Sequence, residues 1–425
     1  MAAGDAASGS LSDVLEAVPI GELPPVGDVP PAMHAQVIRQ DRFGEPRDAF
    51  RPEVVPVPSI GPGEVLVAVM AAGINYNNVW AARGVPADVI ANRQRSGQPH
   101  DFHIGGSDAS GVVYAVGDDV ETPQVGDHVV VHPGYWDPAD PDVVGGEDPM
   151  LSRSARIWGY DTNFGSFAQF AVAQAHQCLP KASQLTWEEA AASTLVGTTA
   201  YRMLHGWEGH TVQPGDAVLV WGGSGGVGIQ AIQIAKAHGA DAVAVVSSAE
   251  RGEYAVRHGA AGYVDRTEFA HWGTAPHWTD GPAQKEWMSA ARALKQRYRE
   301  VLGRGDDPAI VIEHPGESTM PTSMFLCRRG GMVAICAGTT GYSATLDLRY
   351  LWVLQKRLQG SHGTNDAQAH AYNRLIAEGE ITPALGEVVA FEGIPDAHQR
   401  MGDGVEVFGN RVALVGAPEK GLGAA

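Results

Sequence analysis

The chain has 425 residues, which is enough for two domains with separate hydrophobic cores. Its 30 basic and 49 acidic side chains give a formal net charge of -19, which argues against nucleic acid or an anionic membrane as a partner. Three cysteines (Cys178, Cys327 and Cys336) without short spacing offer neither a disulfide framework nor a cysteine zinc site, so we expect a cytoplasmic protein.

The first 34 residues form a predicted N-terminal arm rich in Ala, Gly, Asp and Pro. The arm has no basic start followed by an apolar core, so it is not a signal peptide. No stretch of the chain reaches the length of a membrane span. We expect the arm to be loose or wrapped over a neighbouring subunit.

Residues 35–186 contain short β-rich runs separated by Gly and Pro, the clearest being 64–70, 111–116 and 128–132. Such runs are typical of a compact, mainly β domain. Thr186 is a plausible N-cap for a helix over 187–204.

From residue 187 to 360, apolar strands and helices alternate. This alternation predicts an α/β fold with a doubly wound parallel sheet. The predicted elements are 217–221, 227–238, 242–246, 250–258, 262–264, 309–312 and 331–334.

A polar insertion interrupts the alternation at about 266–307, and its later half, 283–302, predicts an amphipathic helix. The insertion carries three tryptophans, for which local packing is favoured over a subunit contact. After residue 360 the chain returns to helix and strand character, and 361–425 is expected to complete the first domain. The tryptophans are Trp272, Trp278 and Trp287.

The apolar run 217–221 is followed by a glycine-rich turn and a helix of small and apolar residues. This order suits a dinucleotide: the glycines let backbone N–H groups approach a pyrophosphate, which rests on the helix N-terminus. A tight turn without a ligand is the alternative. The candidate cofactor-binding residues of the turn are Gly223, Ser224, Gly225, Gly226, Val227 and Gly228.

The end of the next strand indicates which dinucleotide binds. NAD sites place Asp or Glu there to hold the ribose 2′-OH, whereas this chain has Ser247 and Ser248, with Arg251 close behind. Two hydroxyls and a guanidinium suit a 2′-phosphate, so the predicted cofactor is NADPH.

The order of a β domain, a nucleotide domain and a return to the first domain resembles the medium-chain dehydrogenase/reductase superfamily. That resemblance implies a GroES-like, mainly β catalytic domain beside a Rossmann NADPH-binding domain. In its zinc alcohol dehydrogenases a Gly-His-Glu motif helps to hold the metal, but Ser107 stands at the histidine position here. The cysteine expected near 73–78 and the structural-zinc cysteine cluster are absent as well, so we expect no zinc.

Further segments resemble the crotonyl-CoA carboxylase/reductase family in consistent order from about residue 35 to the end. The resemblance implies that His314, in one of these segments, is a cofactor-binding residue. The segments are 70–80, 156–165, 185–191, 313–316, 349–352, 360–362 and 373–377.

This resemblance implies reductive carboxylation of a 2-enoyl-CoA. NADPH delivers hydride to the β-carbon, and the resulting enolate attacks CO2 through its α-carbon to give an alkylmalonyl-CoA. The chain has no Ala-Met-Lys-Met biotin motif and no lysine in its glycine-rich turn for ATP, so CO2 would be captured directly.

The family's CO2 pocket is carried by four positions, which fall here on Asn77, Tyr160, Asp161 and His362. Asn77 and His362 are expected to donate to CO2 oxygens, and Tyr160, where Phe is common, to exclude water. The acid is usually Glu, so Asp161 is shorter by one methylene and is expected to reach His362 less directly. The alternative for all four is that they are hydrogen-bonded polar residues under a loop.

Gly363 stands where many crotonyl-specific members have Phe, so the resemblance implies room for an acyl chain longer or bulkier than crotonyl. A backbone bend is the alternative for this glycine. Coenzyme A carries phosphates, and basic residues flanking the last elements of the nucleotide domain are the candidate clasp, unless they are an ordinary solvated face. These are Arg328, Arg349, Lys356 and Arg357, with Arg329 beside them.

Two other interpretations of the sequence stay open. A non-carboxylating enoyl-CoA, enoyl-ACP or quinone reductase would need the same NADPH fold, and an NADPH-binding sensor would need the fold without catalysis. The resemblance further implies a homotetramer, built as a dimer of dimers, and a role in supplying polyketide extender units.

Overall fold

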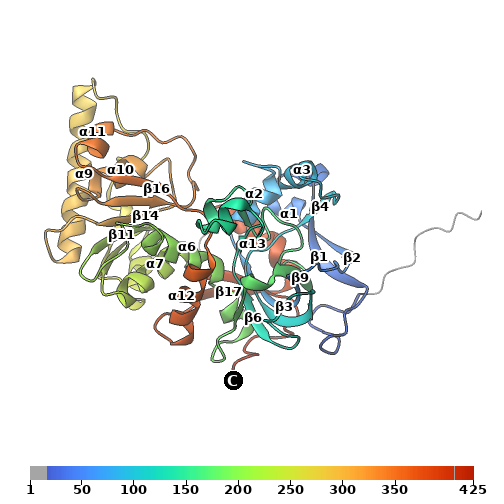
Figure 1. The fold of residues 1–425 in the computed structure, drawn as a ribbon. Helices are drawn as coiled ribbons and strands as arrows, with labels where there is room; N and C mark the ends of the chain where they lie inside the picture. Colours follow the sequence, from blue (N-terminus) through green and yellow to red (C-terminus); the bar gives the residue numbers. More distant parts are fainter. Residues whose placement is uncertain (1–16, 406) are drawn as a thin grey trace, which may run out of the picture.

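Two sheets organise this computed structural model, which describes residues 17–405 and 407–425 (Figure 1). The first lobe holds a seven-stranded, largely antiparallel sheet and a smaller three-stranded one, and the second lobe holds a six-stranded parallel sheet. The α/β class and the two predicted architectures are therefore confirmed. Most of residues 1–34, the predicted arm, lies outside the described part or just inside its start. From Ala32 the chain is already in a strand.

The first lobe is built around β3 (Glu64–Ile74), whose apolar side chains are buried on both faces. Three strands of the large sheet pair with it, namely β5 (Ala109–Val116), β9 (Phe170–Gln174) and β18 (Asn410–Leu414). The described end of the arm lies on its own chain in this lobe, since the N–H of Gly21 donates to Val415 O. The other strands of the lobe are β6 (His128–Val131), β10 (Cys178–Pro180) and β17 (Leu385–Val389) in the large sheet, and β1 (Ala32–Arg39), β2 (Arg51–Pro56) and β4 (Phe102–Ile104) in the small one.

The second lobe has the strand order β13-β12-β11-β14-β15-β16. The order reverses between β11 and β14, and such a switch point opens a crevice at the carboxyl ends of the strands. The strands are β11 (Ala217–Trp221), β12 (Asp241–Val246), β13 (Gly262–Asp265), β14 (Ile310–Glu313), β15 (Met332–Ile335) and β16 (Arg357–Gly360). The helices of this lobe are α7 (Gly226–Ala237), α8 (Ala249–Arg257), α9 (Gly281–Leu302), α10 (Met320–Leu326) and α11 (Leu348–Trp352).

The predicted helix over 187–204 is wrong in one respect: two helices replace it, α5 (Trp187–Ala190) and α6 (Thr194–His205). Thr186 does cap the first, in a capping box with Glu189. The break is held by buried polar side chains, because Asn410 donates to Ala192 O at 2.7 Å and Asp108 accepts from the N–H of Leu195.

The return of the chain to the first lobe is gradual. Helix α12 (Asp366–Ala377) packs on α6, where Gly197 leaves room for the ring of Tyr372. Tyr372 and Ile376 lie in the same apolar cluster as the core of the nucleotide lobe, and only β17 and β18 join the first sheet. The predicted domain boundaries, 35–186, 187–360 and 361–425, stay a prediction.

The insertion folds against the parallel sheet through α9 (Figure 1). Trp287 is buried and Trp272 packs edge-on against Trp221, as local packing predicts, whereas Trp278 is 67% exposed. Within the two described ranges, 17–405 and 407–425, no helix combines the length and the apolar composition needed to span a membrane.

Candidate active site

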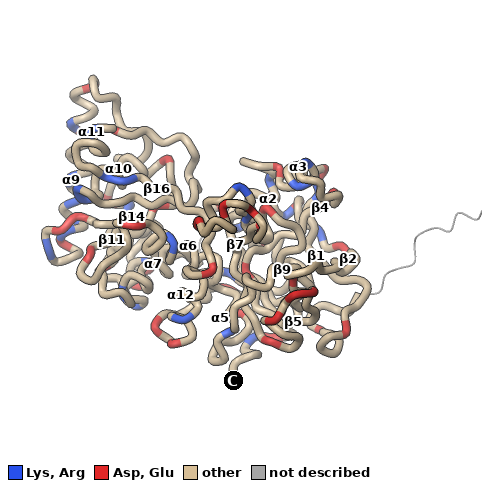
Figure 2. The backbone as a smooth tube through the Cα atoms, in the orientation of Figure 1, with Lys and Arg blue, Asp and Glu red and all other residues tan. Residues whose placement is uncertain are grey.

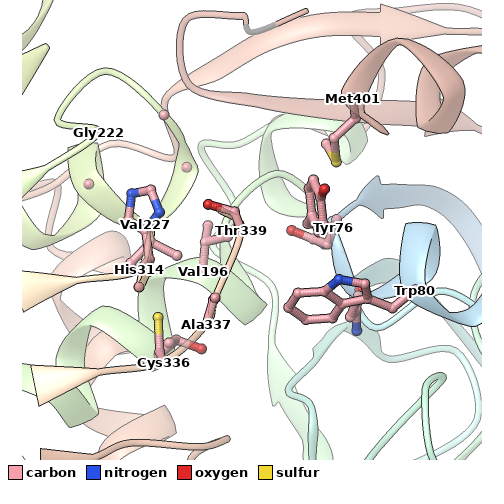
Figure 3. Close-up of a pocket in the computed structure, with 18 of the residues that line it drawn as sticks. Tyr76, Trp80, Val196, Gly222, Val227, His314, Cys336, Ala337, Thr339 and Met401 are labelled. Atoms are coloured by element: carbon pink, nitrogen blue, oxygen red, sulfur yellow. The ribbon is translucent and has the colours of Figure 1, made fainter. Parts of the chain in front are cut away.

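A cavity of about 950 Å³ is lined by residues of both lobes. Figure 3 shows Gly222, Val227 and His314 of the nucleotide lobe on one side, and Tyr76 and Trp80 of the first lobe on the other. The nucleotide side is the carboxyl end of β11 and β14, where the strand order reverses. A cavity at this place in the fold is where a dinucleotide and a second substrate can meet.

The glycine-rich turn forms the floor of the nucleotide side. Gly222 has a φ of 57°, and a Cβ on Gly228 would lie 2.3 Å from Gly222 O, so both positions require glycine. Gly225 caps α7, whose first turn presents free N–H groups to the cavity. Of the predicted residues, Ser224, Gly225, Gly226, Val227 and Gly228 line the cavity. Gly223 does not, because it packs against β12, where a Cβ would lie 2.5 Å from Ala244 Cβ.

Ser247 directly follows β12, and Ser248 caps α8 by accepting from the N–H of Arg251 at 3.4 Å. The Arg251 guanidinium donates to Ser224 Oγ at 3.1 Å and lies over the ring of Phe408. These side chains join the end of β12 to the glycine-rich turn, although they do not line the cavity itself. Hydroxyls and a guanidinium at this point fit a 2′-phosphate, so their role in cofactor binding stays a prediction.

His314 lies at the switch point, directly after β14. Its Nε2 is 3.0 Å from Trp221 O, and a Cβ on Gly222 would lie 2.5 Å from the same nitrogen. The preceding residue, Glu313, was not singled out by the sequence. Its buried carboxylate accepts from Thr319 Oγ1 at 2.7 Å, among other donors, while burial raises its pKa to about 7. Glu313 therefore fixes the loop that carries His314.

Asn77 begins helix α2 (Asn77–Arg83) and lines the cavity. Its Nδ2 donates to Ser107 Oγ at 2.8 Å, and its Oδ1 accepts from Asn78 Nδ2 at 3.0 Å. These two bonds orient the amide and leave one N–H of Nδ2 for another acceptor. Ser107, which replaces the zinc-binding histidine, thus holds Asn77.

Tyr160 and His362 line the same cavity as Asn77. His362 is accessible from the cavity, yet the surrounding protein desolvates its imidazole and lowers its pKa. Burial raises the pKa of Tyr160 to about 12, so its hydroxyl stays neutral. Three of the four residues predicted for the CO2 pocket therefore share one cavity.

Asp161 lies behind this group and does not line the cavity. Its Oδ2 accepts from the N–H of Ile157 at 2.8 Å, and burial raises its pKa. Its charge and that of His362 act on each other, which places the two side chains near one another without a direct hydrogen bond between them.

Gly363 lines the cavity, but the room predicted beside it is partly filled. Its φ is 66°, and a Cβ there would lie 2.4 Å from Met150 Cε and 3.0 Å from Ile157 Cδ1. Met150, in the short helix η2 (Pro149–Leu151), is buried in a cluster with Trp136 and Ile157. The glycine therefore serves a left-handed bend as well as an open wall.

The four basic residues predicted to clasp coenzyme A do not line the cavity. Arg328, Lys356 and Arg357 lie at the amino ends of β15 and β16, whereas the cavity is at the carboxyl ends. Lys356 is buried and donates to Met324 O, and burial lowers its pKa to about 8. Arg349 is paired with Asp347 on the surface.

Sequence proximity to the last elements was the wrong criterion, because a strand separates its two ends. The basic side chains that do line the cavity are Arg266 and Arg411. Elsewhere, basic and acidic positions are scattered over both lobes (Figure 2).

Two aromatic residues of the cavity were missed by sequence reasoning. The rings of Tyr76 and Trp80 are 5.2 Å apart, edge to face, and form the wall opposite the glycine-rich turn. Both stand in the 70–80 segment, and Tyr76 directly precedes Asn77. Their position on either side of Asn77 was the available signal.

Comparisons with known proteins agree with this geometry. Residues 61–183 match the alcohol dehydrogenase GroES-like domain family, and residues 226–378 match the zinc-binding dehydrogenase family. The crotonyl-CoA carboxylase/reductase of Cereibacter sphaeroides is 47% identical over 95% of this chain and 92% of its own.

Two solved structures are also similar to the chain. Crotonyl-CoA carboxylase/reductase AntE in complex with NADP has 53% identity and a TM-score of 0.90, over 94% of this chain and 98% of AntE. The 2-octenoyl-CoA carboxylase reductase CinF, in complex with NADP and 2-octenoyl-CoA, has 40% identity and a TM-score of 0.85, over 94% and 91%.

Proposed function

Because this chain belongs to the crotonyl-CoA carboxylase/reductase family of the medium-chain dehydrogenase/reductase superfamily, we propose that it catalyses the NADPH-dependent reductive carboxylation of a 2-enoyl-CoA. One observation carries the proposal: Asn77, Tyr160 and His362 line the same cavity as the glycine-rich turn and His314. A reductase needs only the turn, whereas capture of CO2 needs polar donors beside the reacting carbon.

The residues of the nucleotide lobe fit NADPH. The N–H groups of the first turn of α7 face the cavity for a pyrophosphate, and Ser247, Ser248 and Arg251 stand where the 2′-phosphate would be held. When bound, NADPH supplies a hydride to the β-carbon of the enoyl thioester. The residues at the zinc position, Ser107 above all, engage in hydrogen bonds with the site and offer no metal ligand set.

The first lobe supplies the CO2 pocket. The oriented amide of Asn77 donates its remaining N–H to one CO2 oxygen, and the imidazole of His362 donates to the other. Bound in this way, CO2 is an electrophile that the α-carbon of the enolate attacks, forming one carbon–carbon bond and a carboxylate. Tyr160 covers the pocket and excludes water, whose proton would otherwise end the reaction as simple reduction.

The proposed acyl substrate is a crotonyl group or a longer or bulkier homologue, with alkylmalonyl-CoA as a polyketide extender unit. Gly363 favours the longer chain, and its neighbour Met150 limits the depth. A non-carboxylating enoyl or quinone reductase is the second candidate, because Asp161 is anchored to Ile157 rather than to His362. An NADPH-binding sensor would have no need of the polar pocket.

We propose a cytoplasmic homotetramer. Cys178, Cys327 and Cys336 are unpaired thiols, as in a reducing compartment. Strand β16 is the edge of the parallel sheet, and Leu358 on it is 38% exposed beside the exposed Trp352. Two copies that pair through β16 would continue the sheet and cover these apolar side chains.

The test is NADPH consumption with crotonyl-CoA, hex-2-enoyl-CoA or a quinone, with and without bicarbonate and carbonic anhydrase. A reductive carboxylase consumes NADPH with the enoyl-CoA and yields a product heavier by one carboxyl group when CO2 is present. A plain reductase yields the saturated acyl-CoA under both conditions. A sensor binds NADPH and oxidises none.

A further inference from the structure

Three titratable side chains outside the CO2 pocket meet at one point between the lobes. His132 follows β6, His176 lies in the short helix η3 (Ala175–Gln177), and Asp366 is the first residue of α12. Asp366 Oδ1 is 3.1 Å from His132 Nε2 and 2.8 Å from His176 Nδ1. Asp366 follows His362 by four residues, so the cluster stands at the end of the loop that carries the proposed CO2 donor.

The hydrogen bonds of His176 require a proton on both ring nitrogens. The amide of Gln174 is fixed, because its Nε2 donates to Trp136 O at 2.7 Å and its Oε1 accepts from Trp136 N at 3.3 Å. His176 Nε2 must therefore donate to that Oε1, at 2.8 Å, while Nδ1 donates to the Asp366 carboxylate. The resulting imidazolium stacks on Trp136 with ring centroids 4.2 Å apart, a face that attracts cations.

His132 is fixed in a different state. Its Nδ1 accepts from the N–H of Gly134 at 3.2 Å, so its Nε2 carries the proton that is donated to Asp366. Burial raises the pKa of Asp366, but the hydrogen bonds from both histidines outweigh burial and hold that pKa below the ordinary value. Both rings thus face Asp366 with N–H groups, whereas a metal ion would need their lone pairs.

The loop from Ser361 to Asp366 is held at both ends. The N–H of Ser361 donates to Ile335 O at 2.7 Å, which ties the loop to the nucleotide lobe, and Asp366 ties it to the histidines of the first lobe. In between, Gly134 lies so close to Thr364 O that a Cβ would be 2.1 Å away.

A second ion pair supports the same end of the loop. Asn365 donates to Asp148 Oδ1 at 3.2 Å, and Asp148 pairs with the buried Arg202 of α6 at 2.8 Å. The charged groups around the loop end are therefore Asp366 with His176, and Asp148 with Arg202. Each carboxylate has one cation as its partner, so the region is balanced in charge.

We propose that Asp366 is a positioning residue for carboxylation: clamped by neutral His132 and cationic His176, it sets the loop so that His362 faces the CO2 pocket. The inference rests on the proposed function, because its effect is on the capture of CO2 and not on hydride transfer. Loss of the clamp frees one end of the loop, and a displacement of His362 by about 1 Å is costly in a preorganised site.

The experiment compares Asp366→Ala with Asp307→Ala. Asp307 is a matched control, since it is held between Lys295 at 2.6 Å and Arg299 at 2.8 Å, away from the cavity. For each enzyme, the carboxylated fraction of the product is measured against CO2 concentration at saturating NADPH and enoyl-CoA. In D366A we expect the half-carboxylation concentration to rise roughly tenfold, with the rate of NADPH oxidation within about twofold of wild type. D307A leaves both unchanged, and D366N, which still accepts from His132, falls between.

An unchanged CO2 dependence in D366A, from a wild type that carboxylates, overturns the positioning role and leaves the proposed function intact. A wild type that yields only saturated product contradicts the proposed function itself. The proton positions are tested without catalysis, by neutron diffraction from deuterated crystals. Deuterons on both nitrogens of His176 support the clamp. A bare Nδ1, or zinc retained stoichiometrically after incubation with ZnCl2 and lost in D366A, overturns it.

Discussion

The carboxylate of Asp161 is anchored to its own turn, because its Oδ2 accepts the backbone N–H of Ile157 at 2.8 Å. A Glu at this position would extend beyond the turn toward His362. We expect Asp161→Glu to lower the CO2 concentration at which half of the product is carboxylated, by about fivefold if one hydrogen bond worth roughly 1 kcal/mol is gained. Asp161→Asn, which keeps the length and removes the charge, raises that concentration. An identical CO2 dependence in D161E and wild type would mean that Asp161 has no influence on His362.

Arg251 is expected to select the phosphorylated cofactor. Removing a charge-assisted contact to a 2′-phosphate costs about 1.5–3 kcal/mol, so Arg251→Ala should raise the KM for NADPH roughly 10- to 100-fold and leave NADH kinetics unchanged. Arg257→Ala, at the other end of α8, is the matched control. Initial rates with both dinucleotides give the answer, and an equal loss with NADPH and NADH would contradict it.

Met150 is expected to set the depth of the acyl pocket, since it fills the space beside Gly363. Met150→Ala should raise the ratio of kcat/KM for 2-octenoyl-CoA over crotonyl-CoA by about tenfold, because one or two methylenes are worth about 1–3 kcal/mol in an apolar pocket. The same change should lower stability by about 2–5 kcal/mol. Met33→Ala, in the buried core of β1, removes a comparable side chain and should lower stability without changing the ratio. A specificity unchanged in M150A would refute the assignment.

Glu313 is expected to make stability fall as pH rises. Burial raises its pKa from 4.5 to about 7, so the folded protein binds the proton more tightly than the unfolded chain over that interval. Unfolding free energy should therefore decline between those two pH values by on the order of 3 kcal/mol and then level off.

In Glu313→Gln this decline should be absent, which melting temperatures across the interval will show. Glu286→Gln, on the exposed face of α9, is the control and should keep the wild-type profile. Parallel profiles for wild type and E313Q would show that Glu313 is already ionised throughout.

The parts of the site that sequence could predict are those set by local backbone chemistry. The glycine-rich turn, its helix and the serine cap of α8 follow from short-range rules, and the structure has them within one residue of the prediction. Asn77, Tyr160 and His362 were placed by resemblance to a family, and they come together from three separate segments of the chain.

What sequence could not predict depends on long-range neighbours. The sequence predicts a surface cation at Lys356, yet the fold buries it against the end of α10, and only the strand direction shows that it is far from the cavity. The break after α5 is set by Asp108 and Asn410, which are remote in sequence. Gly363 predicted open space because nothing local indicates that Met150 fills it.

The most direct test of the central claim is the mass of the acyl-CoA formed from hex-2-enoyl-CoA and NADPH in ¹³C-bicarbonate with carbonic anhydrase. We predict that most of the product carries one added ¹³C carboxyl group, and that Asn77→Ala shifts the product toward the saturated acyl-CoA while NADPH is still consumed. If wild type gives only saturated acyl-CoA at ample CO2, the chain is a reductase and the polar pocket does not capture CO2.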